Sequence, residues 1–281
     1  MNDRPLISVI IPCYQQAHYL VAAIESVRAQ SYTRHEIIVI DDGSTDDTSS
    51  VATRYDGLRC IRQRNQGLPA ARNTGLRASA GEYVVFLDAD DRLLPWALET
   101  GVHALRARPE CALVYGCCEF IDHAGAALPT PPHPVVAQPE HYRALFDRNY
   151  IWTPGAAMFR RTVLMEVGGF DETLIRGCED LDIYLRIAKD RPLYGHGRIV
   201  LQYRKHAGSM SMKLTNMLRA ENQLFRKHLK IVTGDDELAE LCRRKIIPTH
   251  RLLWRRVLLR LGATLRVRTR LRALKLALIK Q

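Results

Sequence analysis

Three carboxylates within four positions follow a buried apolar run. The stretch GEYVVFLDADDRLLP spans residues 81–95, and its carboxylates are Asp88, Asp90 and Asp91. In an extended chain alternate side chains share a side, so Asp88 and Asp90 point together and Asp91 points away. Carboxylate pairs bind hard divalent cations, Mg²⁺ or Mn²⁺, and leave positions for phosphate or water. The alternative is a helix cap with an acidic first turn, and Asp91 is expected only to start the next helix.

The elements around this stretch predict an α/β domain with a mainly parallel, Rossmann-like sheet flanked by helices. Apolar runs alternate with helical patterns, with strands expected at 6–12, 37–40, 60–64 and 83–87 and helices at 19–27, near 46 and at 68–80. Ligands of such sheets collect at the carboxyl ends of the strands. Pro12, Tyr14, Asp41 and the Asp88–Asp91 cluster all lie at that edge.

The second half is less regular. We expect helices at 96–107, 161–167 and from 179, strands at 112–116 and 201–203, and a proline-rich loop at 128–139. The pattern from 216 onward is nearly all helical. Glu179 and Asp180 begin one of these helices, where the helix dipole alone would favour acidic residues.

The positive charge is concentrated at the C-terminal end. The chain of 281 residues has a net charge of +11, and residues 241–281 contain 13 Lys or Arg and no Asp or Glu. Leucines at helical spacing among arginines are typical of a segment that lies on an anionic membrane surface. Packing on the catalytic domain or on a second copy of the chain, in a homo-oligomer, is the alternative. Nucleic acid is not expected as a partner, because aromatic residues are nearly absent there.

Cysteine usage and hydropathy indicate the compartment. The seven cysteines form no CxxC pair, which is typical of free thiols in a reducing cytosol. No stretch of eighteen uninterrupted apolar residues and no signal peptide is recognisable. We therefore expect a cytoplasmic protein, peripheral at the inner face of the membrane if the basic tail binds lipid.

Four separated stretches resemble glycosyltransferase family 2 in that family's order. They read SVIIPCYQQAHYLVAAIESVRAQSYTRHEIIVIDDGSTDDT, NQGLPAARNTGLRASAGEYVVFLDADD, GGFDETLIRGCEDLDIYLRIA and YRKHAGSMS, and the likeness covers roughly residues 5–215. The resemblance implies a GT-A fold and inverting transfer of a sugar from a nucleotide-diphosphate donor, most often a UDP-sugar. It also implies a catalytic domain at 1–215, with a nucleotide-sugar half at 1–100 and an acceptor half at 101–215. A basic helical extension at 216–281 would follow.

The resemblance also implies a role for each matching residue. Carried over, the nucleotide-sugar is bound by Pro12, Tyr14, Asp41, Arg72 and Asp88, the metal by Asp90 and His206, and the reaction uses the pair Glu179 and Asp180. Asp180 would be the base that deprotonates the acceptor hydroxyl, if burial and the charge of Glu179 raise its pKa. The metal would neutralise the leaving diphosphate, with help from His206 or Arg204. The sequence contains neither GxGxxG nor GxxxxGK[ST], so no glycine-rich loop is expected to bind the diphosphate in place of the metal.

The sequence indicates less about the residues that bind the acceptor. Trp152 precedes the Glu179 helix and is a candidate to stack on an acceptor sugar, although a core position is as compatible with the sequence. The acceptor is expected to be a glycan or a lipid-linked sugar of surface polysaccharide or glycolipid synthesis. Two other functions stay open: metal-dependent phosphoryl transfer or hydrolysis with an aspartate nucleophile, and non-catalytic nucleotide-sugar binding.

Overall fold

The computed structural model describes residues 4–133, 141–210 and 214–246. The chain divides into two compact units, Met1–Met212 and Lys213–Gln281. The predicted boundary after residue 215 lies close to this division. The first unit carries every predicted site residue, and the second is described by itself below.

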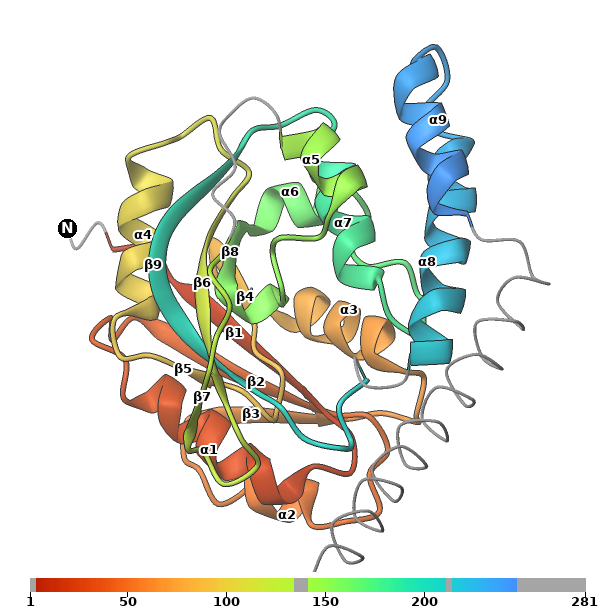
Figure 1. Cartoon of the computed structure of the whole chain (residues 1–281). Coiled ribbons are helices and arrows are strands. Elements are labelled where there is room, and N and C mark those ends of the chain that lie inside the picture. Colours follow the sequence, from red (N-terminus) through yellow and green to blue (C-terminus); the bar gives the residue numbers. More distant parts are fainter. Residues whose placement is uncertain (1–3, 134–140, 211–213, 247–281) are drawn as a thin grey trace, which may run out of the picture. The chain divides into compact units, whose positions relative to one another are not determined.

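The first unit is built on one curved sheet with helices on both faces (Figure 1). In the described residues the sheet has nine strands: β1 Ile7–Cys13, β2 His35–Asp41, β3 Leu58–Arg62, β4 Tyr83–Phe86, β5 Arg92–Leu93, β6 Leu113–Ile121, β7 Ala127–Leu128, β8 Ala157–Arg160 and β9 Leu193–Arg204. The helices are α1 Ala17–Arg28, α2 Thr48–Ala52, α3 Leu68–Ala78, α4 Ala97–Arg106, α5 His141–Asp147, α6 Arg161–Glu166 and α7 Glu179–Ala188, with a 3₁₀ turn, η1, at Pro154–Ala156.

The N-terminal half of the sheet is parallel. The order is β3-β2-β1-β4-β8-β6-β9-β5, and β7 pairs with β6. The pairs β1–β2, β1–β4 and β2–β3 are parallel, joined by crossover helices as the alternating pattern predicts. Every residue of β1 is buried, because helices cover both faces. The carboxyl ends of β1, β2 and β4 therefore meet at one edge.

The C-terminal half of the sheet is mixed. Strand β8 is antiparallel to both β4 and β6, whereas β6 and β9 are parallel with register shifts near Tyr115 and Cys117. Strand β9 has twelve residues, far longer than the expected strand at 201–203. Its first part reads LYGHGRI and lacks a continuous apolar run, which hides it in the sequence.

Two layers of side chains hold the helices on the sheet. Ile7, Val9 and Ile11 of β1 join the cluster that also contains residues of α1 and α4. Ile10 points to the other face, where a Cβ added to Gly75 of α3 would lie 2.2 Å from its Cγ2 atom. Figure 1 shows α3, α6 and α7 on that face. Helix α3 therefore lies very close to β1, and this closeness places its N-terminal half near the site.

The second unit contains two described helices, α8 Leu214–Leu229 and α9 Asp236–Lys245. Asp235 caps α9 by accepting a hydrogen bond from the Leu238 amide at 2.9 Å. Most of the basic segment 241–281 lies outside the described residues, as does the end of the 128–139 loop. Among the described residues, no helix combines the length and the apolar character needed to cross a bilayer.

Candidate active site

The ends of β1 and β2 are joined to each other by hydrogen bonds. The Asp42 amide donates to the Cys13 carbonyl at 2.9 Å, and the Gln15 amide donates to the Ser44 hydroxyl at 3.1 Å. Gln15 has a φ of 56°, which is uncommon for a residue other than glycine. Pro12 is buried within β1, whereas Tyr14 just beyond it has half of its surface exposed. Of these two residues, both predicted to bind the nucleotide-sugar, only Tyr14 presents its side chain to the surface.

Asp41, which the resemblance predicts to bind the nucleotide-sugar, lies inside the protein. Its carboxylate accepts from the Ser44 amide at 2.8 Å and the Ser49 hydroxyl at 2.5 Å, and Arg62 lies 3.2 Å away. The side chain has no exposed surface. Asp41 therefore holds the turn that follows β2, and a hydrogen bond to the nucleotide would require one of these partners to be exchanged.

Arg72 is also buried and joins two carboxylates. Its guanidinium donates to Glu179 at 2.6 Å and to Asp88 at 2.7 Å, and only 1% of its surface is exposed. Burial opposes the charge, but the two carboxylates outweigh it and raise the pKa of Arg72. Arg72 thus has no free surface for a nucleotide. It fixes Asp88 and Glu179 instead, which makes it a positioning residue.

Asp90 and His206 come together although 116 positions separate them. Asp90 Oδ2 lies 2.8 Å from His206 Nε2 and accepts a weaker hydrogen bond from Gln16 at 3.4 Å. The His206 ring lies 5.1 Å from the ring of Tyr19 on α1. Burial and the charge of Asp88 raise the pKa of Asp90, while His206 opposes that shift. The two predicted metal residues are therefore neighbours at the strand edge.

This pair fits a divalent cation. A carboxylate oxygen and an imidazole nitrogen are both donors that Mn²⁺ accepts, and a cation held by two side chains keeps positions for phosphate oxygens and water. Mg²⁺ suits the carboxylate better than the imidazole. The described residues contain no group of three or more His, Cys, Asp and Glu side chains arranged to hold a metal.

Asp91 and Arg204 differ from the sequence-based expectation. Asp91 does not start a helix: it is buried, accepts a hydrogen bond from the Arg204 amide at 2.8 Å, and is followed by the short strand β5. The Arg204 guanidinium donates to the carbonyls of Asp90, Asp122 and His123 at 2.7 to 3.0 Å. Its Nε and Nη1 atoms therefore fix the backbone of the Asp88–Asp91 turn.

Glu179 and Asp180 form the first turn of α7. Cys178 before them has a φ of 65°, so a strained turn sets the direction of this helix. Asp180 keeps part of its surface exposed. Its carboxylate accepts hydrogen bonds from the Leu181 amide at 2.7 Å and from the Asn149 side chain at 3.3 Å. Burial and the charge of Glu179 raise the pKa of Asp180 to about 7. Of the two acids, Asp180 has the exposure and the proton affinity that a general base needs.

Trp152 is partly buried among other rings. Its ring centre lies 3.7 Å from that of His133 and 5.1 Å from that of Phe120. His133 occupies one face of the indole, so this face is not open to a sugar in the structure. The acceptor role of Trp152 stays a prediction.

Four further polar side chains hold the site or its surroundings, and of these only Asn73, beside Arg72 at the start of the helix expected at 68–80, is indicated by the sequence. Thr153 lies 3.4 Å from Asp88, Asn149 contacts Asp180 and Gln16 contacts Asp90. Asn73 exchanges two hydrogen bonds with the backbone of Phe170, at 2.8 and 2.9 Å. The last contact fixes the loop that leads to α7 against α3.

Comparison with known proteins identifies the family of the chain. The profile of Glycosyl transferase family 2 matches residues 8–168, more than half of the chain. The chain belongs to this family. An uncharacterized glycosyltransferase of Rickettsia prowazekii is 29% identical over 83% of the chain and 74% of its own length. The chondroitin synthase of Escherichia coli is 30% identical over 81% of the chain but only 32% of its own length.

Solved structures show the same fold as this family 2 glycosyltransferase. S. aureus TarS 1–349 in complex with UDP-GlcNAc superimposes with a TM-score of 0.65 at 19% identity, covering 85% of the chain and 70% of TarS 1–349. The mannosyltransferase PcManGT from Pyrobaculum calidifontis, in complex with GDP-Man and Mn²⁺, gives 0.64 at 22% identity, covering 87% and 70%. These likenesses confirm the predicted GT-A fold.

Proposed function

We propose that this glycosyltransferase is an inverting, metal-dependent enzyme that moves a sugar from a nucleotide-diphosphate donor, a UDP-sugar, to a hydroxyl of a glycan or lipid-linked acceptor. The observation that supports it best is the contact of 2.8 Å between Asp90 and His206 at the sheet edge. When bound there, a divalent cation supplies a Lewis acid for the leaving diphosphate. Similar structures bind UDP-GlcNAc, or GDP-Man with Mn²⁺.

The proton of the acceptor hydroxyl is proposed to move to Asp180. Its carboxylate is partly exposed, and a pKa of about 7 lets it be ionised in part and still hold a proton at neutral pH. Arg72 holds the adjacent Glu179 in the interior at 2.6 Å, where the charge of Glu179 raises the pKa of Asp180 without meeting the acceptor. A single carboxylate that acts as the base, while the acceptor oxygen displaces the diphosphate in one step, is consistent with inversion at the anomeric carbon.

Phosphoryl transfer through an aspartate nucleophile is less consistent with the geometry. The first aspartate of the turn, Asp88, is held by Arg72 at 2.7 Å and by Thr153 at 3.4 Å. A nucleophile engaged by a buried guanidinium would lose much of its reactivity, because the ion pair stabilises the unreacted carboxylate.

A donor screen followed by two variants tests the proposal. Thermal shift with nucleotide sugars, with and without Mn²⁺, should reveal one donor whose stabilisation depends on the metal. With that donor, Asp90→Asn and Asp180→Asn should each lower turnover at least about 100-fold, the scale of a lost metal ligand or general base. Asp56→Asn, at an exposed turn remote in sequence from these motifs, is the control. Full activity of both site variants would overturn the assignment of roles.

A further inference from the structure

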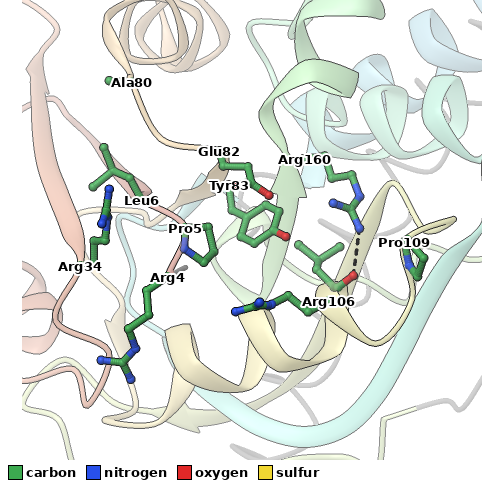
Figure 2. Close-up of a pocket in the computed structure, with 11 residues that line it drawn as sticks. Arg4, Pro5, Leu6, Arg34, Ala80, Glu82, Tyr83, Arg106, Pro109 and Arg160 are labelled. Carbon is green, nitrogen blue, oxygen red and sulfur yellow. Dashed lines mark hydrogen bonds between the residues drawn. The ribbon is translucent and has the colours of Figure 1, made fainter. Parts of the chain in front are cut away.

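A concave pocket at the opposite edge of the sheet is too remote to hold the acceptor. It has a volume of about 610 Å³ and is lined by residues that precede β1, β2 and β4 and by the ends of α4 and β8 (Figure 2). Strand β1 has seven residues, so roughly 23 Å of sheet separate this pocket from the candidate active site. The acceptor must therefore lie on another surface, beside the carboxyl ends of the strands.

Four aromatic rings form a continuous row on the described part of the chain. Neighbouring ring centres lie 3.7 Å apart for His133 and Trp152, 5.1 Å for Trp152 and Phe120, and 5.8 Å for Phe120 and Tyr203. All four side chains are partly exposed, and they come from four separate segments of the chain. Ligand sites are lined mostly by apolar and aromatic side chains, and a sugar ring offers apolar C–H faces to such a lining. These four residues are called the aromatic row below.

Trp152 connects the aromatic row to the candidate active site. It directly precedes Thr153, whose hydroxyl lies 3.4 Å from the carboxylate of Asp88. Asn149, three residues before Trp152, donates to Asp180 at 3.3 Å. Because consecutive Cα atoms are only about 3.8 Å apart, the row borders both the end of β4 and the proposed base.

Lys205 adds a positive charge at the other end of the row. Its Nζ atom lies 4.1 Å from the ring centre of Tyr203 and 4.4 Å from that of Phe120, and its side chain is partly exposed. In the part of the chain that the structure describes, no carboxylate forms an ion pair with this ammonium and no group accepts a hydrogen bond from it. The ammonium therefore has three donors available to a ligand.

Two carboxylates on the neighbouring strands do not pair with Lys205. Glu119 points to the opposite face of β6 from the aromatic row, because successive side chains of a strand alternate, and it accepts a hydrogen bond from Gln202 at 2.8 Å. Asp91 is buried and accepts a hydrogen bond from the Arg204 amide at 2.8 Å. Its charge acts on Lys205 only over more than 4.0 Å. The exposed side of the ammonium is thus left without a counter-charge.

Lys205 also faces away from the proposed metal ligands. The guanidinium of Arg204, one residue earlier, donates to the Asp90 carbonyl at 2.7 Å. The ring of His206, one residue later, lies 2.8 Å from the Asp90 carboxylate. Lys205 between them reaches the rings at the end of the aromatic row instead. Its charge is directed to the acceptor side of the edge and not to the leaving diphosphate.

We propose that the aromatic row is an acceptor subsite and that Lys205 binds an acidic group, a carboxylate or a phosphate, on the acceptor sugar. The rings contact the apolar face of the sugar, and the ammonium donates charge-assisted hydrogen bonds, which are roughly twice as strong as neutral ones. A neutral sugar leaves the ammonium without a partner. This inference rests on the proposed function, because it names the class of acceptor.

Three sugars that differ only at C6 test the preference for charge: methyl β-D-glucoside, the corresponding uronate and the corresponding 6-phosphate. The background Trp96→Phe/Trp254→Phe leaves Trp152 as the single tryptophan of the chain, so its fluorescence reports a ligand on the row. Titration at physiological salt in EDTA removes any contribution from a metal at Asp90. At least one acidic probe should bind saturably and about tenfold or more tightly than the neutral probe, the scale of a charged hydrogen bond.

Substitutions of two lysines in this background separate the site from a general charge effect. Lys205→Met should weaken binding of the acidic probe at least about tenfold, to the affinity of the neutral probe, whereas Lys205→Arg keeps the charge and should keep the preference. Lys189→Met removes the same charge from an exposed position after α7 and should stay within about twofold of the parent, because exposed charges are screened by salt. Unchanged melting temperatures are expected and establish that all variants are folded.

The possible outcomes decide both the site and the kind of acidic group. Absence of saturable binding of both acidic probes, equal affinity for acidic and neutral probes, or equal losses in Lys205→Met and Lys189→Met would each overturn the proposal. Tighter binding of the uronate assigns the site to a carboxylate-bearing acceptor, and tighter binding of the 6-phosphate assigns it to a phosphate-bearing one.

The measurement is independent of sugar transfer, because no donor is present. A protein that prefers the acidic probe through Lys205 but transfers no sugar would contradict the proposed function alone. A protein that transfers sugar but lacks this preference would contradict the acidic-acceptor inference alone.

Discussion

Arg72 donates to Glu179 at 2.6 Å in the interior of the protein, and this bond joins α3 to the first turn of α7. The same guanidinium reaches Asp88 at the end of β4. The end of β4, helix α3 and the first turn of α7 are therefore connected through one side chain. The turn that carries Asp90 and the turn that carries Asp180 are held in a fixed relation by a residue that touches neither of these two carboxylates.

The first prediction concerns the stability of this connection. Arg72→Met should lower the free energy of unfolding by about 3–5 kcal/mol, because it leaves a buried carboxylate without its partner. Urea unfolding measures the change. Arg77→Met on the exposed side of the same helix should cost no more than about 0.5 kcal/mol. If the two variants lost similar amounts of unfolding free energy, the buried ion pair would not stabilise the fold as predicted.

The carboxyl-edge location of the site could be predicted from the sequence, because apolar runs that end in Asp41 and Asp88 are local features. Asp90, His206 and Asp180 are indeed near the strand ends and the helix start that the motifs indicated. Local patterns contain no information on partners far along the chain. The burial of Arg72 and the hydrogen bonds of Arg204 to three carbonyls depend on such partners, so the sequence did not predict these contacts.

The second prediction is a pH dependence. Asp180 acts as a base only when it is ionised, and its pKa is raised to about 7 by burial and by Glu179. The ratio kcat/KM should therefore rise with pH through about 7, with a tenfold fall per pH unit well below it. Asn149→Ala removes a donor that stabilises the ionised form, so this variant should shift the acid limb to higher pH.

The control for this profile is Asp182→Asn, whose carboxylate is buried in an ion pair with Arg186 on the same helix. This variant should lower stability and leave the midpoint of the acid limb unchanged. An acid limb of Asn149→Ala whose midpoint equals that of the wild type, or lies at lower pH, would contradict the assignment of Asp180 as the base.

The third prediction concerns the metal. EDTA should abolish transfer and excess Mn²⁺ should restore it, if Asp90 and His206 hold the cation. His206→Ala should raise the Mn²⁺ concentration needed for half-maximal activity by about 10–100-fold, because one ligand is lost. Tyr19→Leu removes the ring beside His206 and leaves both ligands, so it should shift this concentration far less. Equal metal requirements of wild type and His206→Ala would exclude His206 as a ligand.

The fourth prediction uses the sign of a stability change to test the packing of α3. In an exposed helix, Gly→Ala stabilises by roughly 1 kcal/mol. A Cβ at position 75 would instead lie 2.2 Å from Ile10 Cγ2 in β1, so Gly75→Ala should destabilise by about 1–3 kcal/mol. Thr74→Ala, one position earlier, should be neutral or slightly stabilising. Because α3 carries Arg72 toward Asp88, a helix displaced from β1 should also lower activity in Gly75→Ala. A stabilised and fully active Gly75→Ala protein would mean that α3 does not lie this close to the sheet.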